Sequence, residues 1–210
     1  MSRRVDPTAP LLISAAEFVA TFSPPAYVLE GVLQRGYLYA LTGKTGSGKT
    51  AIALHIAQAV ARGCKIRERE TTPGRVLYLA GENPEDVRAR FLTLAEYEDF
   101  DPASLPIQFV AGARKFDEIV DRICGEARRF DDFALVIVDT AAAFFPGDDG
   151  NNNAQQGDYA RSLRKLTALP GRPAVLVPCH PAKAAGREGL LPVGGGAFLN
   201  EIDGNLTVWA

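Results

Sequence analysis

Short runs of aliphatic and β-branched residues recur along the chain, and segments with apolar residues at helical spacing lie between them. Most of these runs lack strict alternation of apolar and polar positions, which is typical of strands covered on both faces. This order of elements predicts an α/β fold in which helices flank a mostly parallel, twisted sheet. The expected strands are residues 37–41, 76–80, 107–110, 134–138, 174–177 and 206–209.

Four segments have the apolar spacing of helices that pack through one side. In the first of them, Ile52, Ile56, Ala59 and Val60 fall on a single stripe. Pro84 suits the first turn of the second. The expected helices are residues 50–61, 84–95, 116–128 and 155–169.

Two stretches lack the residues that build regular elements. Residues 146–157 include Asp148, Asp149 and a run of asparagines, with almost nothing apolar to bury, so we expect an exposed, mobile loop. Residues 181–196 are rich in glycine and proline, which indicates irregular structure. Each of the two stretches follows an expected core strand.

One glycine-rich segment fits the pattern G-x-x-x-x-G-K-[ST] and lies between an expected strand and an expected helix. In such a segment the backbone N–H groups point inward and the helix N-terminus adds positive potential, which together hold phosphates. Lys49 would reach the β and γ phosphates, and Thr50 would bind Mg²⁺. A glycine-rich turn with a chance lysine is the structural alternative. The sequence thus predicts that ATP and Mg²⁺ are bound by Gly43, Lys44, Thr45, Gly46, Ser47, Gly48, Lys49 and Thr50.

Two carboxylates end or follow expected strands. Asp139 ends the apolar run 134–138, where a Walker B carboxylate that holds Mg²⁺ would stand; an ordinary strand-end aspartate is the alternative. Glu82 lies just past residues 76–80, at the sheet edge where α/β proteins bind ligands. No glutamate follows Asp139 directly, so Glu82 is our candidate for the base that polarises the attacking water. A role at the start of the next helix, which Asn83 can cap, is the alternative.

A histidine and two basic residues follow the expected strand 174–177. His180 should share the phosphate edge, where its imidazole could sense the γ phosphate; an ordinary structural histidine is equally compatible. Lys183 and Arg187 would reach a phosphate of a neighbouring subunit or of nucleic acid, or else face solvent. We interpret His55, in the middle of an expected helix, as structural.

The 210 residues, 47% of them hydrophobic, suffice for the core of one globular domain. Lys and Arg number 23 against 25 acidic residues, so a polyanion such as DNA would need a local patch. Arg161, Arg164 and Lys165, at helical spacing, are interpreted as a solvated face. The three cysteines lack metal-binding spacing and are interpreted as idle thiols of a cytoplasmic protein. No apolar run approaches the roughly 20 residues of a membrane helix.

Taken together, residues 43–50, 78–83, 134–145 and 179–183 resemble the RecA-like P-loop ATPases, and among them the plasmid RepA-type hexameric helicases. The likeness extends over about 29–206, so we expect an N-terminal extension, 1–28, before an ATPase domain, 29–210. The resemblance implies a RecA-type fold and Mg²⁺-dependent ATP hydrolysis. It also implies a homo-oligomer, either a ring or a filament, with ATP bound between neighbours; among the RepA-type relatives a hexameric ring is expected.

The same resemblance implies a DNA motor that acts as a replicative helicase or accessory ATPase. The loops 146–157 and 181–196 occupy the places where such motors contact single-stranded DNA. Matched position by position, Lys49 contacts phosphate, Thr50 contacts Mg²⁺, Glu82 is the catalytic glutamate, Asp139 is the Walker B carboxylate and His180 is the γ-phosphate sensor.

Two departures from the family pattern keep other functions open. Helicase relatives often carry a basic residue where this chain has Val193, and the loop 146–157 is acidic, without an aromatic platform for bases. A nucleotide-gated assembly module with little turnover is therefore one alternative. A P-loop kinase for a small molecule is another, although the long loops hold few of the arginines that a kinase lid needs.

Overall fold

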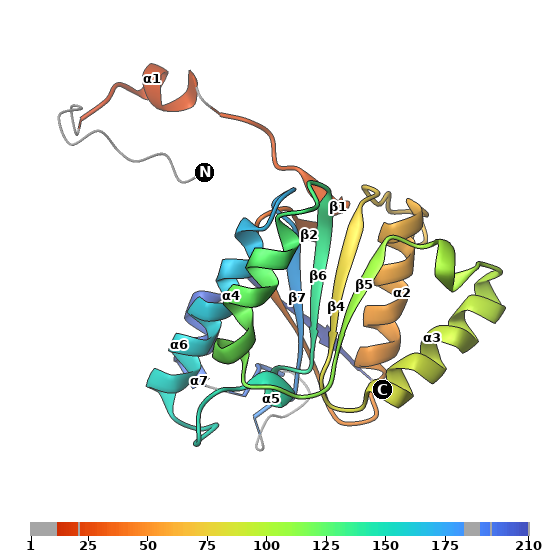
Figure 1. The fold of residues 1–210 in the computed structure, drawn as a ribbon. Helices are drawn as coiled ribbons and strands as arrows, with labels where there is room; N and C mark the ends of the chain where they lie inside the picture. Colours follow the sequence, from red (N-terminus) through yellow and green to blue (C-terminus); the bar gives the residue numbers. More distant parts are fainter. Residues whose placement is uncertain (1–11, 21, 183–189, 194, 210) are drawn as a thin grey trace.

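The computed structural model describes residues 12–20, 22–182, 190–193 and 195–209. A six-stranded sheet forms their centre, with strand order β5-β4-β6-β7-β3-β8 and parallel pairing between neighbours (Figure 1). Because the strands are parallel, their carboxyl ends meet at one edge of the sheet. The strands are β3 (Leu38–Gly43), β4 (Arg75–Ala80), β5 (Ile107–Ala111), β6 (Phe133–Asp139), β7 (Ala174–Cys179) and β8 (Gly204–Val208).

Helices cover both faces of the sheet and enclose two separate hydrophobic cores (Figure 1). This three-layer arrangement confirms the predicted α/β fold with a parallel sheet flanked by helices. On one face lie α2 (Lys49–Arg62) and α3 (Pro84–Glu98), and on the other lie α4 (Phe116–Ala127) and α6 (Asn153–Arg164).

Strand β3 shows why apolar and polar residues do not alternate in the sequence. Tyr39 and Leu41 belong to the core under α2 and α3, whereas Leu38 and Ala40 belong to the core under α4 and α6. All four side chains are buried, so both faces of the strand need apolar residues. Each of the six expected strands corresponds to an observed one.

Several short elements were not expected from the sequence. They are the helices α1 (Ala15–Ala20), α5 (Ala141–Phe144) and α7 (Gly195–Glu201), the hairpin of β1 (Tyr27–Leu29) and β2 (Leu33–Gln34), and the 3₁₀ turn Pro102–Ser104. The helix expected over 155–169 is observed as α6 followed by the 3₁₀ turn Lys165–Ala168. Most of these are too short for a periodic pattern to be recognised.

The polar stretch 146–157 is only partly a loop, which corrects our expectation. The side chain of Asn152 accepts hydrogen bonds from the backbone N–H groups of Ala154 (3.0 Å) and Gln155 (3.2 Å), so it caps the start of α6. Gln156, in the first turn of that helix, is buried. Asparagine is a preferred N-cap residue, and the asparagines that suggested a loop therefore mark a helix start.

Two further expectations need correction. Ile52 does not share the buried stripe of α2, because its side chain is 37% exposed while Ile56 is buried. The stretch 181–196 ends in regular structure, since α7 begins at Gly195. Residues 183–189 and 194 of that stretch lie outside the described part of the chain.

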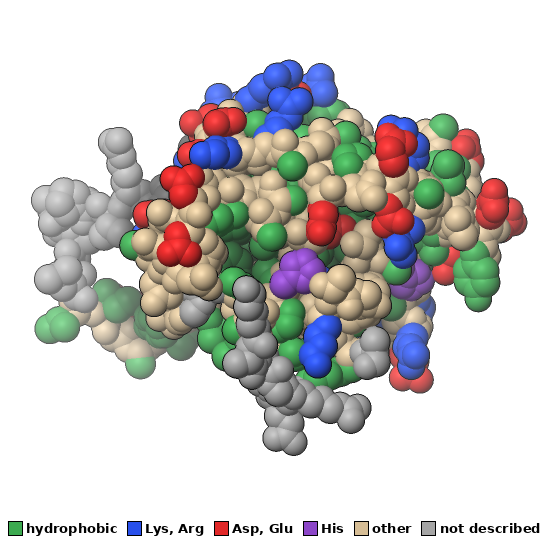
Figure 2. All heavy atoms as spheres, turned by 90° about the horizontal axis from the view of Figure 1, so that it is seen from below, with side chains coloured by type: hydrophobic (Ala, Val, Ile, Leu, Met, Phe, Trp, Pro, Cys, Tyr) green, Lys and Arg blue, Asp and Glu red, His purple; other side chains and the backbone are tan. Residues whose placement is uncertain are grey.

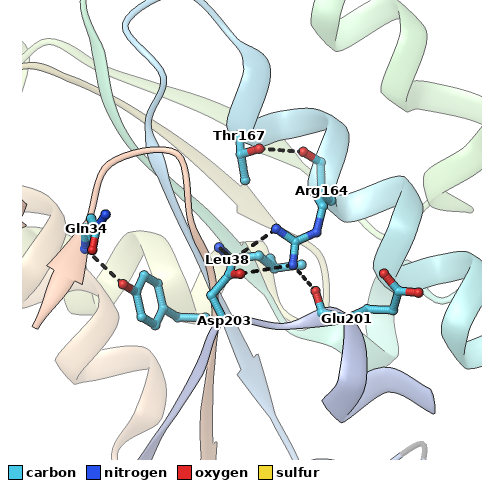
Figure 3. Close-up of polar contacts among 7 residues, drawn as sticks. Gln34, Leu38, Arg164, Thr167, Glu201 and Asp203 are labelled. Carbon is cyan, nitrogen blue, oxygen red and sulfur yellow. Dashed lines mark hydrogen bonds and ion pairs between the residues drawn. The ribbon is translucent and has the colours of Figure 1, made fainter. Parts of the chain in front are cut away.

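The basic residues of α6 are ion-paired rather than simply solvated. Arg164 donates hydrogen bonds to the Asp203 carboxylate (3.0 Å) and to the Glu201 backbone oxygen (Figure 3). Arg161 pairs with the Glu201 carboxylate at 2.8 Å. Asp203 also accepts a hydrogen bond from the backbone N–H of Leu38 at 2.8 Å. These contacts attach the turn before β8 to α6 and to the first residue of β3.

No helix within the described ranges is long and apolar enough to cross a membrane. Cys64, Cys124 and Cys179 are free thiols, and burial raises the pKa of Cys179 to about 12. A thiol with such a pKa stays protonated and unreactive at neutral pH.

Candidate nucleotide site

The phosphate-binding segment connects β3 to α2. Gly46 and Gly48 have φ values of 80° and 88°, in the left-handed region that favours glycine, and no atom lies within 4 Å of the place of a Cβ. The backbone of the segment therefore borders open space. At Gly43 a Cβ would lie 2.5 Å from the Ser47 Oγ, so glycine is needed there for close packing. The buried Ser47 hydroxyl has no hydrogen-bond partner among the described residues.

Lys49 begins α2 and turns its ammonium group back over the segment. Its Nζ donates hydrogen bonds to the backbone oxygens of Gly43 (2.8 Å) and Lys44 (2.9 Å), and the side chain is buried. Burial lowers the pKa of Lys49, while the charges of Asp139 and Glu82 raise it. An ammonium held against loop carbonyls at a helix N-terminus is placed to exchange those carbonyls for phosphate oxygens.

Asp139 ends β6 at the same edge and is 3% exposed. Its Oδ2 accepts a hydrogen bond from the Tyr78 hydroxyl at 2.7 Å, whereas its Oδ1 is buried without a partner. Burial raises the pKa of Asp139, and the hydroxyls of Tyr78 and Thr50 lower it. A buried carboxylate oxygen without a hydrogen bond is costly, and beside a threonine hydroxyl it fits a hard cation such as Mg²⁺.

Glu82 and Thr140 stand next to each other across β4 and β6. The Thr140 hydroxyl donates a hydrogen bond to the Glu82 carboxylate at 3.3 Å. The N-cap of α3 is Asn83, whose side chain accepts from the backbone N–H of Asp86 at 3.2 Å. The capping function is thus performed by Asn83, and Glu82 is left to face the nucleotide edge.

These residues meet in one cleft of about 190 Å³ at the carboxyl edge of the sheet. His180 lines the same cleft, which follows from the position of β7 between β6 and β3. The cleft therefore brings together the predicted site residues Thr45, Gly46, Gly48, Lys49, Thr50, Glu82 and His180. The other predicted residues, Gly43, Lys44, Ser47 and Asp139, do not line it. Asp139 is buried next to Thr140 and within electrostatic reach of Lys49 and Glu82.

Four polar residues of the site were not expected from the sequence, and one of them is Thr140, the hydrogen-bond donor to Glu82. Asp86 and Arg90 of α3 line the cleft, and the Arg90 guanidinium donates to the Asp86 carboxylate at 2.6 Å. Their spacing of four positions on a helix that starts just after Glu82 was a usable signal. Tyr78, the hydrogen-bond donor to Asp139, looked like an ordinary core residue of a strand.

The edge of the sheet that carries the cleft shows no broad basic surface. Figure 2 looks onto this edge: where side chains are drawn in colour, Lys and Arg stand separately or in small groups, interspersed with Asp and Glu. Lys183 and Arg187, our candidate phosphate contacts, lie outside the described residues. Val193 is described, and its backbone N–H donates to the His180 backbone oxygen at 2.9 Å.

Comparison with known proteins adds two findings. A family model, AAA_25, described as an AAA domain, matches residues 4–186. The DNA repair and recombination protein RadB of Methanosphaera stadtmanae is 26% identical over 162 residues. The aligned region covers 75% of this chain and 64% of RadB, so the chain spans less than two thirds of that relative's length.

Proposed function

The chain belongs to the AAA_25 family of AAA domains and is a RecA-like P-loop ATPase domain, and we propose that it hydrolyses ATP to act on single-stranded DNA. The observation that carries the ATPase assignment is the cleft itself. Lys49, Glu82 and a glycine-rich backbone segment face one small space, and the buried Asp139 lies within electrostatic reach of both side chains. These are the groups that phosphoryl transfer to water requires.

We assign the phosphate groups of ATP to the segment 43–50. The backbone N–H groups around Gly46 and Gly48 and the ammonium of Lys49 would bind the phosphate oxygens, with the Ser47 hydroxyl as a further donor. Lys49 would leave the backbone oxygens that it now contacts. The exchange replaces neutral acceptors with charged ones, which form stronger hydrogen bonds.

Thr50 and Asp139 would hold Mg²⁺, the first through its hydroxyl and the second through its free Oδ1, directly or through water. Bound Mg²⁺ neutralises charge that develops on the phosphate oxygens. Tyr78 positions the carboxylate by its hydrogen bond to Oδ2 and leaves Oδ1 free.

Glu82 would act as the general base that orients and deprotonates the attacking water. Its carboxylate lies in the cleft with Lys49, and the Thr140 hydroxyl fixes its direction. His180, on the opposite side of β6 from Glu82 in the strand order, would respond to loss of the γ phosphate. The backbone oxygen of His180 accepts a hydrogen bond from the backbone N–H of Val193, so a movement of His180 would be transmitted to Val193.

We propose the domain division 1–28 and 29–210, which agrees with Val28 being the first buried residue among those that the structure describes. We propose a RepA-type helicase or accessory replication motor that works as a ring of copies, a hexamer. RadB, a repair and recombination protein by name, supports a DNA client. An oligomer would complete the cleft, because its described lining supplies only Lys49 and Arg90 as lysine or arginine side chains, and Arg90 is paired with Asp86.

A nucleotide-gated assembly module is the second candidate. Val193 favours it, because an apolar side chain there cannot supply the cation that accelerates phosphoryl transfer by several orders of magnitude. Such a module would bind ATP, assemble and hydrolyse little.

The test is Glu82→Gln, with Glu85→Gln as the matched control. Glu85 lies three residues after Glu82 in the first turn of α3, pairs with Arg88 at the surface and does not line the cleft. We expect Glu82→Gln to bind ATP as the wild type does and to hydrolyse it at least about 100-fold more slowly, which is the lower limit for loss of a general base. Glu85→Gln should hydrolyse at the wild-type rate.

Phosphate release should be measured with and without excess single-stranded DNA, at two salt concentrations. Stimulation by DNA that weakens with salt supports the motor. Near wild-type hydrolysis by Glu82→Gln would remove Glu82 from catalysis. ATP binding by the wild type without hydrolysis, with or without DNA, would replace the motor by the assembly module.

A further inference from the structure

A second cavity, of about 180 Å³, lies beside the nucleotide cleft. We call it the α5–α6 cavity, because its described walls come from α5, from α6, from the end of β7 and from Val193. These walls are mostly apolar and aromatic, and none of the residues described there is a lysine, arginine, aspartate or glutamate. A charged molecule would be buried there without a counter-charge, which is costly, so the cavity suits a neutral one.

The cavity and the nucleotide cleft lie toward opposite faces of the sheet. Tyr159 and Cys179 of the cavity belong to the core under α4 and α6, whereas the cleft is lined by residues of α2 and α3. His180, just after β7, lines both spaces. A molecule in the cavity would therefore touch a residue that also borders the nucleotide.

Tyr159 brings an unused hydrogen-bond donor to the wall of the cavity. The residue is 1% exposed, and its hydroxyl is buried without a hydrogen-bond partner among the described residues. Burial raises the pKa of Tyr159 well above its ordinary value, and the nearby Cys179 adds to the rise. The hydroxyl thus remains a donor at neutral pH, and it lies on the side of the ring that faces another wall residue of the cavity. A buried hydroxyl without a partner is costly and calls for an explanation.

Two other polar groups of the wall already have partners. The Gln156 side-chain Nε2 donates a hydrogen bond to the Gly150 backbone oxygen at 2.9 Å. The Cys179 thiol donates to the Val177 backbone oxygen at 3.2 Å. A ligand would therefore find the Tyr159 hydroxyl free to donate to one of its acceptor atoms.

The shape of the wall suits a ring. The rings of Phe145 and Tyr159 meet edge to face, with centroids 5.6 Å apart and planes at 74°. Aromatic side chains in such an arrangement offer both edges and faces to a third ring. An engineered cavity of about 150 Å³ binds benzene, so the α5–α6 cavity has room for one ring with a small substituent.

We propose that the α5–α6 cavity is a binding site for a small, neutral ring molecule whose carbonyl oxygen accepts a hydrogen bond from the Tyr159 hydroxyl. The described walls hold no lysine or arginine to bind the phosphates of a nucleic-acid strand, which favours a free molecule. Because His180 borders both spaces, this ligand and the nucleotide should change each other's affinity by the same factor. This last step rests on the proposed nucleotide site, whereas the binding of the ligand does not.

The experiment uses acetophenone, a single ring with a carbonyl group, and toluene, a similar ring without an acceptor. Binding to the purified chain is followed in the NMR signals of each compound, without nucleotide. Tyr159→Phe removes the donor and keeps the ring. Ala142→Trp narrows the cavity from an exposed wall position, and Tyr37→Phe, 39% exposed and outside the walls, is the control.

We expect the wild type and Tyr37→Phe to bind acetophenone equally. Tyr159→Phe should bind it about 3- to 10-fold more weakly, which corresponds to the net value of one hydrogen bond. Toluene should bind to the wild type and to Tyr159→Phe with the same affinity, because it makes no hydrogen bond. Ala142→Trp should bind neither compound, yet bind a fluorescent ATP analogue as the wild type does, since Ala142 does not line the nucleotide cleft.

Thermal melts without ligand test whether the Tyr159 hydroxyl is free. Tyr159→Phe should keep the wild-type Tm or raise it, because the hydroxyl has no described partner to lose. A fall of roughly 2–4 °C, the size expected for loss of about one hydrogen bond in a domain of this length, would show that the hydroxyl already has a partner, and the proposal would be wrong.

The remaining outcomes also decide between the ideas. If the wild type does not bind acetophenone, or if Tyr159→Phe binds it equally well, the site is not the one proposed. If single-stranded oligothymidylate displaces acetophenone from the wild type, the cavity takes a base of a strand and not a free molecule. If acetophenone binds as expected but leaves the affinity for the ATP analogue unchanged, the site stands and its coupling to the nucleotide through His180 is wrong.

Discussion

Replacing Tyr78 with phenylalanine tests how far the hydrogen bond from the Tyr78 hydroxyl stabilises the buried carboxylate of Asp139. Tyr78 is fully buried, and its hydroxyl donates the hydrogen bond to Asp139 Oδ2 at 2.7 Å. Burial raises the pKa of Tyr78 well above its ordinary value, so the hydroxyl remains a donor at neutral pH. In Tyr78→Phe the ring stays but Oδ2 loses this donor, and Oδ1 already has no partner, so the nearby Thr50 hydroxyl is the remaining donor that favours the ionised carboxylate.

We expect Tyr78→Phe to lower the free energy of unfolding by about 1.5–3 kcal/mol, the range for a hydrogen bond to a charged group. For a domain of this size, a loss of about 2 kcal/mol corresponds to a fall in Tm of roughly 4–8 °C. Thermal melts followed by circular dichroism without nucleotide measure the change. Tyr97→Phe, at a position 86% exposed, is the control and should leave Tm unchanged.

The pH dependence of the difference in stability between wild type and Tyr78→Phe is a second test of the role of this hydrogen bond. The hydrogen bond from Tyr78 lowers the pKa of Asp139, against the larger upward effect of burial, so its loss raises that pKa further. The hydrogen bond stabilises the ionised carboxylate. The full difference in free energy of unfolding between wild type and Tyr78→Phe is therefore present only at pH values above the folded-state pKa of Asp139 in both proteins. The gap in stability between wild type and Tyr78→Phe should therefore shrink as the pH falls through those values. A gap of less than about 0.5 kcal/mol at pH 8, the usual size of neutral surface changes, would refute the account.

Three more substitutions probe the site and its support. Lys49→Ala should abolish binding of a fluorescent ATP analogue, and unchanged affinity would defeat the assignment of the phosphate site. Gly81→Ala would place a Cβ 2.5 Å from Phe144 Cε2, so we expect a loss of about 1–3 kcal/mol in a urea denaturation curve, and full stability would show that α5 moves freely. Arg164→Ala removes the hydrogen bonds to Asp203 and should speed amide exchange in β8 more than in β4, whereas equal rates would mean that this contact does not hold β8.

The sheet and the phosphate segment could be predicted because their signals are local. Strands buried on both faces must be apolar throughout, and the runs of β3, β4, β6 and β7 stood out for that reason. The segment 43–50 carries its own backbone requirement in Gly46 and Gly48. Parallel strands bring their carboxyl ends to one edge, so residues that follow strands, such as Glu82 and His180, could be expected in one cleft.

Other features could not be predicted because they depend on partners distant in sequence. Tyr78 belongs to the site only because its hydroxyl donates a hydrogen bond to Asp139, which lies on the neighbouring strand β6 and is distant in sequence. Arg164 looked solvated because its partner Asp203 belongs to a turn at the far end of the chain. Asn152 was read as a loop residue, although asparagine caps helices as readily as it forms turns.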